Sequence, residues 1–275
     1  DDNTTQAAMR LLMELDRELE FKDDAIHEAV LIGLETILAV QYPIGAWPQR
    51  FESPLEDPDT YPVLKASYPD DWPQTYPGTS YKDFYTFNDN AIADVVNTLL
   101  LADAIYDDPR LMASVRKAGD FVVAAQMPDP QPAWAQQYNR SMHPAWARKF
   151  EPASITGGES QGVMRLLITI YRATGDRKYL EPVPRALDYL ESSLLSSGQL
   201  ARFYELKTNR PIYFTRDTYI PTYSDADMPT HYAFKVSSSL GSIRRQYEAA
   251  DALSEDELET ARELFGWIPS PQHMT

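Results

Sequence analysis

The chain has 275 residues, with 25 Lys and Arg against 41 Asp and Glu, so its formal net charge is −16. A protein that coats nucleic acid needs gathered positive charge, because it binds by releasing counterions from phosphates, so this charge argues against a nucleic-acid partner. The absence of cysteine excludes disulfides, thiolate catalysis and cysteine-based zinc sites. With 43% hydrophobic residues the chain can bury a core, and we expect one domain over 1–275 with residues 1–5 disordered.

No apolar run approaches the roughly 20 residues that a membrane span needs. The longest candidates are interrupted by Glu35, Asp94 and Asp103, so we expect no membrane partner. The first residues, 1–6, are polar and do not look like a signal peptide. The chain is therefore expected to be either cytoplasmic or a mature form from which a leader was removed.

Apolar side chains recur at helical spacing in several stretches, which predict helices at 24–41, 91–105, 109–125, 158–172, 177–195, 236–250 and 255–266. Asp108 before Pro109 has the pattern of a helix N-cap, and Ser254 begins the last helix. Between the helices lie Pro- and Tyr-rich stretches at 42–86, 127–153 and 199–234, which predict loops. The third is also rich in β-prone residues, so we expect a few short strands there.

A shift of 68 residues aligns two helix pairs and indicates a weak internal repeat. It aligns Asp108 with Asp176, Val115 with Val183 and Ala118 with Ala186, among other pairs. The alternative is that any two amphipathic hairpins look alike. Hairpins of this kind stack around a common core, so the expected fold is mainly α, an α/α toroid or bundle. Long loops leaving one end, with a few short strands, would form the functional face.

Oxygen-rich side chains gather where the helix at 91–105 begins. Asn88, Asp89 and Asn90 stand there in a row. An Asp at such a place is by default an N-cap, but several oxygen ligands together can also hold a hard cation such as calcium. Glu159, three residues after Thr156, has the spacing of a capping box, which is its expected role.

Positive charge is concentrated in two loop segments of this acidic chain. Residues 201–217 hold four cations and two anions, and residues 140–151 hold three cations and one anion, so each segment carries +2. Four of the five tryptophans lie in the first two loops: Trp47, Trp72, Trp134 and Trp146. Arginine pairs with carboxylates and aromatic rings stack on sugars, so this inventory favours an anionic sugar polymer. The alternative is scattered surface charge neutralised by nearby acids.

At these loops the sequence resembles the family-10 polysaccharide lyases, the pectate lyases with an α/α toroid fold. The matching stretches are Trp47–Gln49, Thr86–Ala91, Trp146–Glu151 with Glu159–Ser160, Arg202–Glu205 and Thr208–Ile212. Together they span about 45 to 217, in one order, which is more specific than any single motif. The chain departs from the family at Gly45-Ala46, where members usually have two glycines, and at Asn139, where many have Asp. Residues 223–235 are not aligned to the family.

The resemblance implies an enzyme that cleaves α-1,4-polygalacturonate by calcium-assisted β-elimination, giving 4,5-unsaturated oligogalacturonates. It implies a secreted or periplasmic protein with its signal peptide removed, and we expect a monomer. Arg216 or Arg210 is the expected base, and Asp89, Glu151 and Asn139 are the candidate metal ligands. Substrate binding is assigned to Arg202, Lys207, Arg148, Lys235 and Asn90, with Trp47 or Tyr138 packing on sugar rings. An arginine base implies an alkaline optimum, because a guanidinium pKa lies above about 12.

Two other functions remain open at this stage. A glycoside hydrolase on an α/α toroid would use paired carboxylates, for which Asp89 with Glu151 or Glu159 could serve. A non-catalytic protein that binds acidic glycans would need only the cationic loops.

Overall fold

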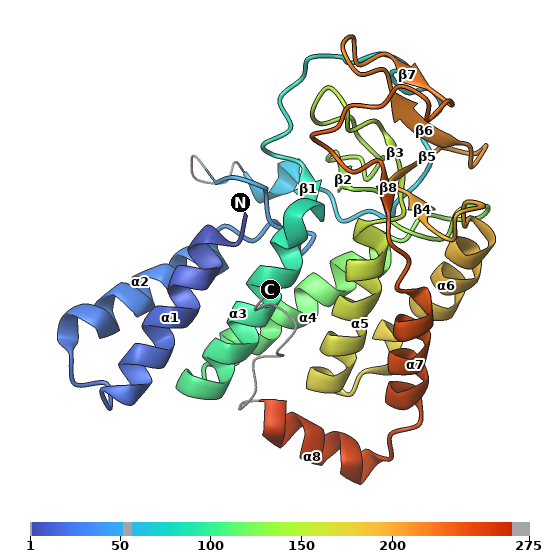
Figure 1. The fold of residues 1–275 in the computed structure, drawn as a ribbon. Helices are drawn as coiled ribbons and strands as arrows, with labels where there is room; N and C mark the ends of the chain where they lie inside the picture. Colours follow the sequence, from blue (N-terminus) through green and yellow to red (C-terminus); the bar gives the residue numbers. More distant parts are fainter. Residues whose placement is uncertain (1, 52–56, 266–275) are drawn as a thin grey trace.

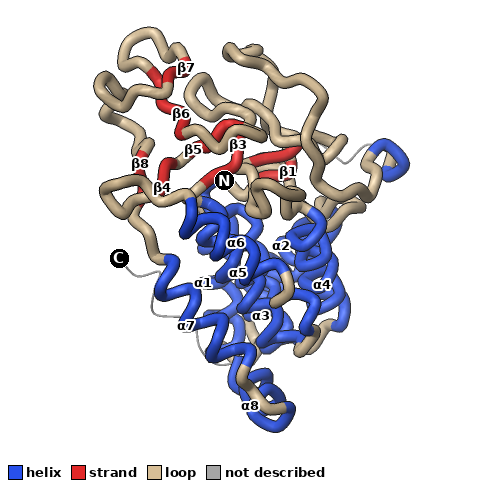
Figure 2. The backbone as a smooth tube through the Cα atoms, turned by 90° about the vertical axis from the view of Figure 1, so that its right-hand side faces the viewer, coloured by secondary structure: helices blue, strands red, loops and turns tan. Residues whose placement is uncertain are grey.

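The protein has a layer of helices at one end and a layer of short strands and long loops at the other. The computed structural model describes residues 2–51 and 57–265. The helices are α1 (Thr4–Glu18), α2 (Asp24–Ala39), α3 (Ala91–Tyr106), α4 (Pro109–Ala124), α5 (Glu159–Thr174), α6 (Pro182–Ser192), α7 (Leu240–Asp251) and α8 (Glu255–Phe265). Figure 1 shows them side by side below the strands, and the second view agrees (Figure 2). The prediction of a mainly α protein is confirmed.

Consecutive helices pack as hairpins, as the periodicity predicts. α1 packs on α2 and α3, α3 on α4, α4 on α5, and α5 and α6 on α7. The apolar stripes of these helices form one buried core, which includes Leu99, Val115, Leu167 and Leu187. Among the described residues, no helix is both long and apolar enough to cross a membrane.

The 68-residue repeat in the sequence appears in the structure as two matching helices, α3 and α5. Shifting the bounds of α3 by 68 residues gives the bounds of α5. Both helices end at a residue with a left-handed backbone, Asp107 at φ +50° and Gly175 at φ +72°. Asp108 and Asp176 follow, and each carboxylate accepts the backbone N–H two residues later. This bond satisfies an N–H that the first helical turn leaves without a partner, so both hairpins turn by the same capping chemistry.

Several predicted helix boundaries differ from the structure. The helix predicted from residue 236 begins at Leu240, because Lys235–Val236 form a strand. The stretch 177–195 forms a 3₁₀ turn at Arg177–Tyr179 and then α6 from Pro182, because proline has no N–H to donate to the preceding turn. At the N-terminus, residues 4 and 5, expected to be disordered, are the first residues of α1. Helix α1 itself was not predicted. Met9 and Met13 bury its inner face.

The strands are short and antiparallel, and they join the long loops. β3 (Ser154–Thr156), β5 (Phe203–Glu205), β6 (Pro211–Phe214) and β7 (Pro221–Thr222) form a four-stranded sheet in that order. β1 (Tyr85–Thr86) pairs with β2 (Gln137–Tyr138), and β4 (Leu200–Ala201) pairs with β8 (Lys235–Val236). The few short strands expected in 199–234 are confirmed, and the sheet connects the second long loop to the third.

Candidate functional site

An unusual backbone turn brings Asp89 to the start of α3. Asp89 and Asn90 both have left-handed φ angles, +51° and +57°, which are uncommon outside glycine. Neither residue caps α3, since the N-cap position, Asn90, makes no side-chain capping bond. The Asp89 carboxylate is exposed and accepts one bond, from Asn88 Nδ2 at 2.6 Å. Strained turns of this kind concentrate at functional sites, so Asp89 is placed as a ligand-binding carboxylate would be.

Glu151 lies close by but is fully engaged. Its side chain is 1% exposed and faces Arg148, whose Nε donates to Oε2 at 2.7 Å. Gln136 Nε2 donates to Oε1 at 2.6 Å and the Tyr232 hydroxyl donates to the same oxygen at 3.1 Å. Since both oxygens are occupied by protein donors, the prediction of Glu151 as a metal ligand is corrected: it anchors an arginine.

Gln136 connects these two residues into one network. Besides Glu151, its Nε2 donates to Asn88 Oδ1 at 2.8 Å, and Asn88 in turn holds Asp89. The turn before α3 and both halves of the second long loop are therefore joined by buried hydrogen bonds. Gln136 Oε1 itself is buried and has no hydrogen-bond partner among the described residues, so the network links Asp89 to Arg148 without satisfying every member.

A second arginine–glutamate pair lies beside the first. Arg202 Nη1 donates to Glu159 Oε1 at 2.8 Å, and its Nε donates to the Ala233 carbonyl at 2.6 Å. The Thr156 hydroxyl donates to Glu159 Oε2, and its oxygen accepts the Glu159 N–H at 3.4 Å. The N-cap of α5 is Gly158, which makes no side-chain capping bond, so the predicted capping box is not formed. The ring of Tyr232 joins the pairs, with the guanidinium carbons of Arg202 and Arg148 at 4.8 and 5.7 Å from its centre.

The charges of this cluster move its pKa values in opposite directions. Loss of hydration raises the pKa of Asp89; Arg148 opposes this, while Asp2, Glu151 and Glu159 raise it further. Burial alone would also raise the pKa of Glu151, but the hydrogen bonds and charge of Arg148 outweigh it, and that pKa is lowered. Asp89 therefore carries negative charge that its surroundings do not fully compensate, which is the condition that favours a bound cation.

The two candidate bases lie in different surroundings. Arg216 is 55% exposed, and its Nε lies 3.3 Å from the Met228 carbonyl and 3.6 Å from Asp227. Met228 packs against the smaller hydrophobic core that includes Phe203 and Phe214, and Phe150, the neighbour of Glu151, packs against the same core. Arg210 instead stacks on Tyr223, with its guanidinium carbon 3.3 Å from the ring centre.

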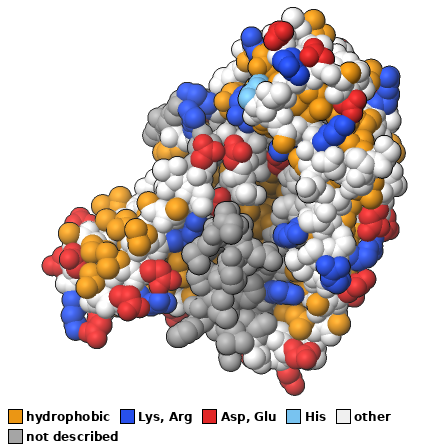
Figure 3. All heavy atoms as spheres, viewed as in Figure 1, with side chains coloured by type: hydrophobic (Ala, Val, Ile, Leu, Met, Phe, Trp, Pro, Cys, Tyr) orange, Lys and Arg blue, Asp and Glu red, His pale blue; other side chains and the backbone are white. Residues whose placement is uncertain are grey.

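The predicted lysines lie in the same strand and loop layer, where Figure 3 shows Lys and Arg among acidic side chains. Lys235 pairs with Asp225. Lys207 donates to the Pro69 carbonyl at 3.4 Å and lies 5.2 Å from the centre of the Trp72 ring. The structure therefore groups Arg148 and Arg202 around Tyr232, links Asp89 to Arg148 through Asn88, Gln136 and Glu151, and places Lys207 beside Trp72.

The predicted sugar-stacking rings are enclosed, and this prediction is corrected. Trp47 is 3% exposed and its indole N–H donates to the Ile37 carbonyl at 2.9 Å. Tyr138 is fully buried, and its hydroxyl donates to the carbonyl of Ala125, the C-cap residue that follows α4. The Tyr204 hydroxyl likewise donates to the carbonyl of Ser193, the residue that follows α6. Both tyrosines close a helix C-terminus, so they are structural.

Asn139 is corrected as well. Its Oδ1 accepts the backbone N–H groups of Ser141 and His143 at 2.9 and 3.2 Å, which closes a turn. This is ordinary turn chemistry for Asn. Asn90 remains an exposed residue beside Asp89.

The sequence reasoning gave no role to Tyr232 or Gln136, which hold the cluster together. Tyr232 comes from 223–235, where no motif aligned, and Gln136 is one of two adjacent glutamines. A buried polar residue has no distinctive spacing, so only the aromatic and cationic character of the neighbouring loops hints at either.

Comparisons with known proteins show what the chain is similar to in sequence and in fold. A family model described as pectic acid lyase matches residues 60–170. The family-10 polysaccharide lyase from Cellvibrio cellulosa has a similar solved structure, with a TM-score of 0.68 and 22% identity over 92% of this chain and 81% of that one. A mutant of that lyase, in complex with trigalaturonic acid, matches with a TM-score of 0.68 and 22% identity over 90% and 79%. A comparison with curated proteins found no match. The predicted resemblance is confirmed, and the comparisons support a polysaccharide lyase.

Proposed function

We propose that this chain, as a polysaccharide lyase, cleaves α-1,4-polygalacturonate by β-elimination and releases 4,5-unsaturated oligogalacturonates. The observation that carries the proposal is the cluster of Arg148 and Arg202 beside an incompletely compensated Asp89. Two arginines held by buried glutamates can bind uronate carboxylates without losing their position. The carboxylate-bearing trimer in the Cellvibrio cellulosa structure is the same class of ligand.

Calcium is part of the proposal, with Asp89 and Asn90 as the residues that would hold it. The fit is partial: within residues 2–51 and 57–265 no group of three or more His, Asp or Glu could hold a metal ion. Calcium takes about six to eight oxygen ligands, so the remainder would come from water and substrate carboxylates. The exposed Asp89 carboxylate, which accepts a hydrogen bond from Asn88, supports a cation there. Bound calcium would neutralise the uronate carboxylate and make the neighbouring C5 proton more acidic.

The chain's own residues then act on a bound uronate. Arg148 and Arg202 orient its carboxylate and stabilise the charge that develops on it as the C5 proton leaves. We assign proton removal to the exposed Arg216, which would accept the C5 proton in its neutral form. The electron pair of the C5–H bond forms the C4–C5 double bond, and the C4–oxygen bond breaks with its electron pair remaining on the glycosidic oxygen, which takes a proton from water. Arg210, stacked on Tyr223, is not proposed as the base.

The hydrolase alternative is less well supported by the carboxylates. Asp89 has the raised pKa that a general acid needs, but Glu151, its candidate partner, is buried and held by Arg148 and Gln136. Glu159 is paired with Arg202, which leaves Asp89 without a carboxylate partner of the opposite role. Binding of acidic glycan without cleavage is the second alternative, and it shares the arginine cluster.

The remaining expectations belong to the same proposal. We propose that the hairpins form an α/α toroid and that the chain is a single catalytic domain. The enzyme is proposed to be a secreted or periplasmic monomer whose partners are polygalacturonate or oligogalacturonides, with no role for nucleic acid or membrane. The successive hairpin contacts support the toroid.

One assay separates the three functions. Incubation with polygalacturonate gives an ultraviolet-absorbing unsaturated product if the protein is a lyase. A hydrolase gives new reducing ends with no chromophore. A binding protein gives neither, although it still retains the polymer.

A further inference from the structure

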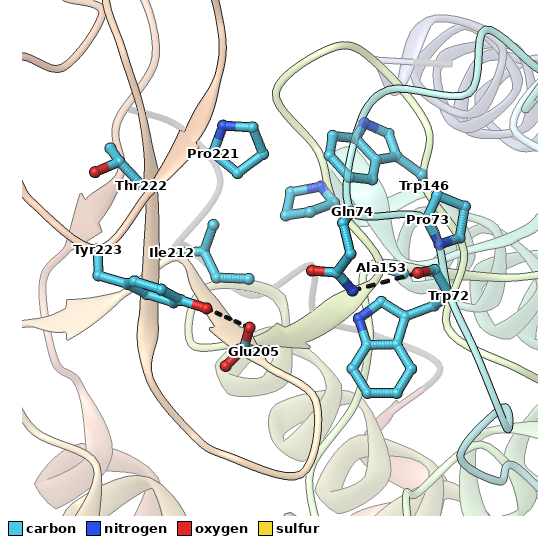
Figure 4. Close-up of a pocket in the computed structure, with 11 residues that line it drawn as sticks. Trp72, Pro73, Gln74, Trp146, Ala153, Glu205, Ile212, Pro221, Thr222 and Tyr223 are labelled. Carbon is cyan, nitrogen blue, oxygen red and sulfur yellow. Dashed lines mark hydrogen bonds between the residues drawn. The ribbon is translucent and has the colours of Figure 1, made fainter.

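A cleft outside the arginine cluster opens between residues 72–74 and the strands β6 and β7 (Figure 4). Its volume is about 160 Å³, and its lining includes Trp72, Gln74, Trp146, Glu205, Ile212 and Tyr223. Drug-sized ligands occupy pockets of roughly 300 Å³ or more. This cleft is smaller and open, which suits a short part of a chain that continues beyond it.

Aromatic side chains stand on both sides of the cleft. Figure 4 shows Trp72 on one side and Tyr223 on the other, with Ile212 between them. Trp72 is partly exposed and Tyr223 is 46% exposed, so both differ from the enclosed Trp47. The Tyr223 hydroxyl donates to Glu205 Oε1 at 2.5 Å, which fixes the orientation of its ring. Fixed, partly exposed aromatic rings are suited to packing against the apolar faces of sugars.

The two cations beside these rings have no carboxylate partner. Lys207 lies 5.2 Å from the centre of the Trp72 ring, and Arg210 lies 3.3 Å from that of Tyr223. No carboxylate in the described part of the chain is within 4 Å of either charge, whereas Arg202 and Lys235 are both paired. In a chain of net charge −16, two cations left without acids and held against aromatic rings are available to an anionic ligand.

The cleft lies next to the arginine cluster. Pro152 and Ala153, which line it, directly follow Glu151. Ile212, also in the lining, pairs across β5 and β6 with Phe203, whose ring stacks on Tyr232 at 6.3 Å. The cluster and the cleft therefore share the segment 151–153 and the strand pair β5–β6.

We propose that this cleft is a second binding site for a uronic-acid polymer, outside the cleavage centre. Trp72 and Tyr223 pack on sugar rings there, while Lys207 and Arg210 pair with carboxylates. The inference rests on the proposed function for the identity of the polymer. Its consequence is that the cleft improves binding of long chains and adds nothing for chains too short to reach it.

The test uses Trp72→Ala and Tyr223→Ala, each compared with Phe21→Ala, an exposed aromatic at the turn between α1 and α2. For each cleft variant we expect KM for polygalacturonate to rise roughly tenfold, from the loss of about one ring contact. The rate on trigalacturonate should be unchanged, and Phe21→Ala should match the parent on both substrates. Circular dichroism checks that each variant is folded.

Retention of the variants on polygalacturonate in affinity electrophoresis provides an independent readout. If the parent binds the polymer without cleaving it, the proposed function fails, while weaker retention of both cleft variants still supports the cleft. The proposal would be overturned if a cleft variant lost activity equally on trigalacturonate and polygalacturonate. It would also be overturned if neither cleft variant lost activity on, or retention by, polygalacturonate.

Discussion

Replacing Glu151 with Gln removes the buried anion that holds Arg148. The carboxylate accepts bonds from Arg148, Gln136 and Tyr232 and is 1% exposed. Gln keeps the shape but offers one oxygen and an NH₂ group that would face these donors. Breaking a buried ion pair by removing one partner costs roughly 3–5 kcal/mol. Arg148 is 36% exposed and can turn toward water, so we expect the lower end, about 3 kcal/mol.

Urea denaturation of the parent and Glu151→Gln measures this loss directly. The matched control is Asp251→Asn, which removes an exposed ion pair with Arg177 and should change the free energy of unfolding by less than about 1 kcal/mol. In thermal melts, 3 kcal/mol corresponds to roughly 6–12 °C for a domain near this size. If Glu151→Gln were no less stable than the control, the buried anchor would be the wrong explanation of this cluster.

The same pair gives a pH dependence with a fixed sign. Because folding lowers the pKa of Glu151, its contribution to stability is fully present above the unfolded value of about 4.3 and is lost as the pH falls through the folded value. The stability difference between the parent and Glu151→Gln should be constant near neutral pH and should narrow below about pH 4. If the stability difference between the parent and Glu151→Gln grew on acidification, folding would not lower the pKa of Glu151.

Three further predictions concern Asp89 and Trp47. Asp89→Ala should reduce cleavage by roughly a hundredfold or more by removing a cation-binding carboxylate. In the parent, calcium affinity measured by titration should fall on acidification, beginning at a higher pH than for an ordinary Asp because the pKa of Asp89 is raised. Unchanged calcium affinity in Asp89→Ala would exclude Asp89 as a calcium ligand. Trp47→Ala should lower the free energy of unfolding by roughly 3–5 kcal/mol, as expected for a buried core ring. A loss below 1 kcal/mol would mean that Trp47 is not packed as described.

Most helices could be predicted because their apolar residues repeat at helical spacing, and the 68-residue shift matched real hairpins. Helix α1 was missed, since Met9 and Met13 are its few buried apolar residues and polar side chains dominate its length. The break before α6 depends on Pro182, which is compatible with a helix start as well as with a loop.

The site was less predictable because the sequence does not show which side chains are enclosed. Composition alone gave Trp47 and Trp72 the same sugar-stacking potential, yet one is in the core and the other borders a cleft. Counting charges located the cationic loops correctly but could not tell that Arg202 is paired with Glu159 while Arg210 stacks on a ring. Pairing depends on contacts between distant loops, and no local pattern encodes it.

The ultraviolet-absorbing product formed from polygalacturonate, measured with added calcium for the parent and Arg216→Ala, tests the central claim most directly. We predict that the parent forms the unsaturated product, faster at alkaline pH, and stops when calcium is chelated. Arg216→Ala should lose nearly all of this rate while still binding the polymer. No chromophore from the parent, or full activity in Arg216→Ala, would contradict the proposed lyase mechanism.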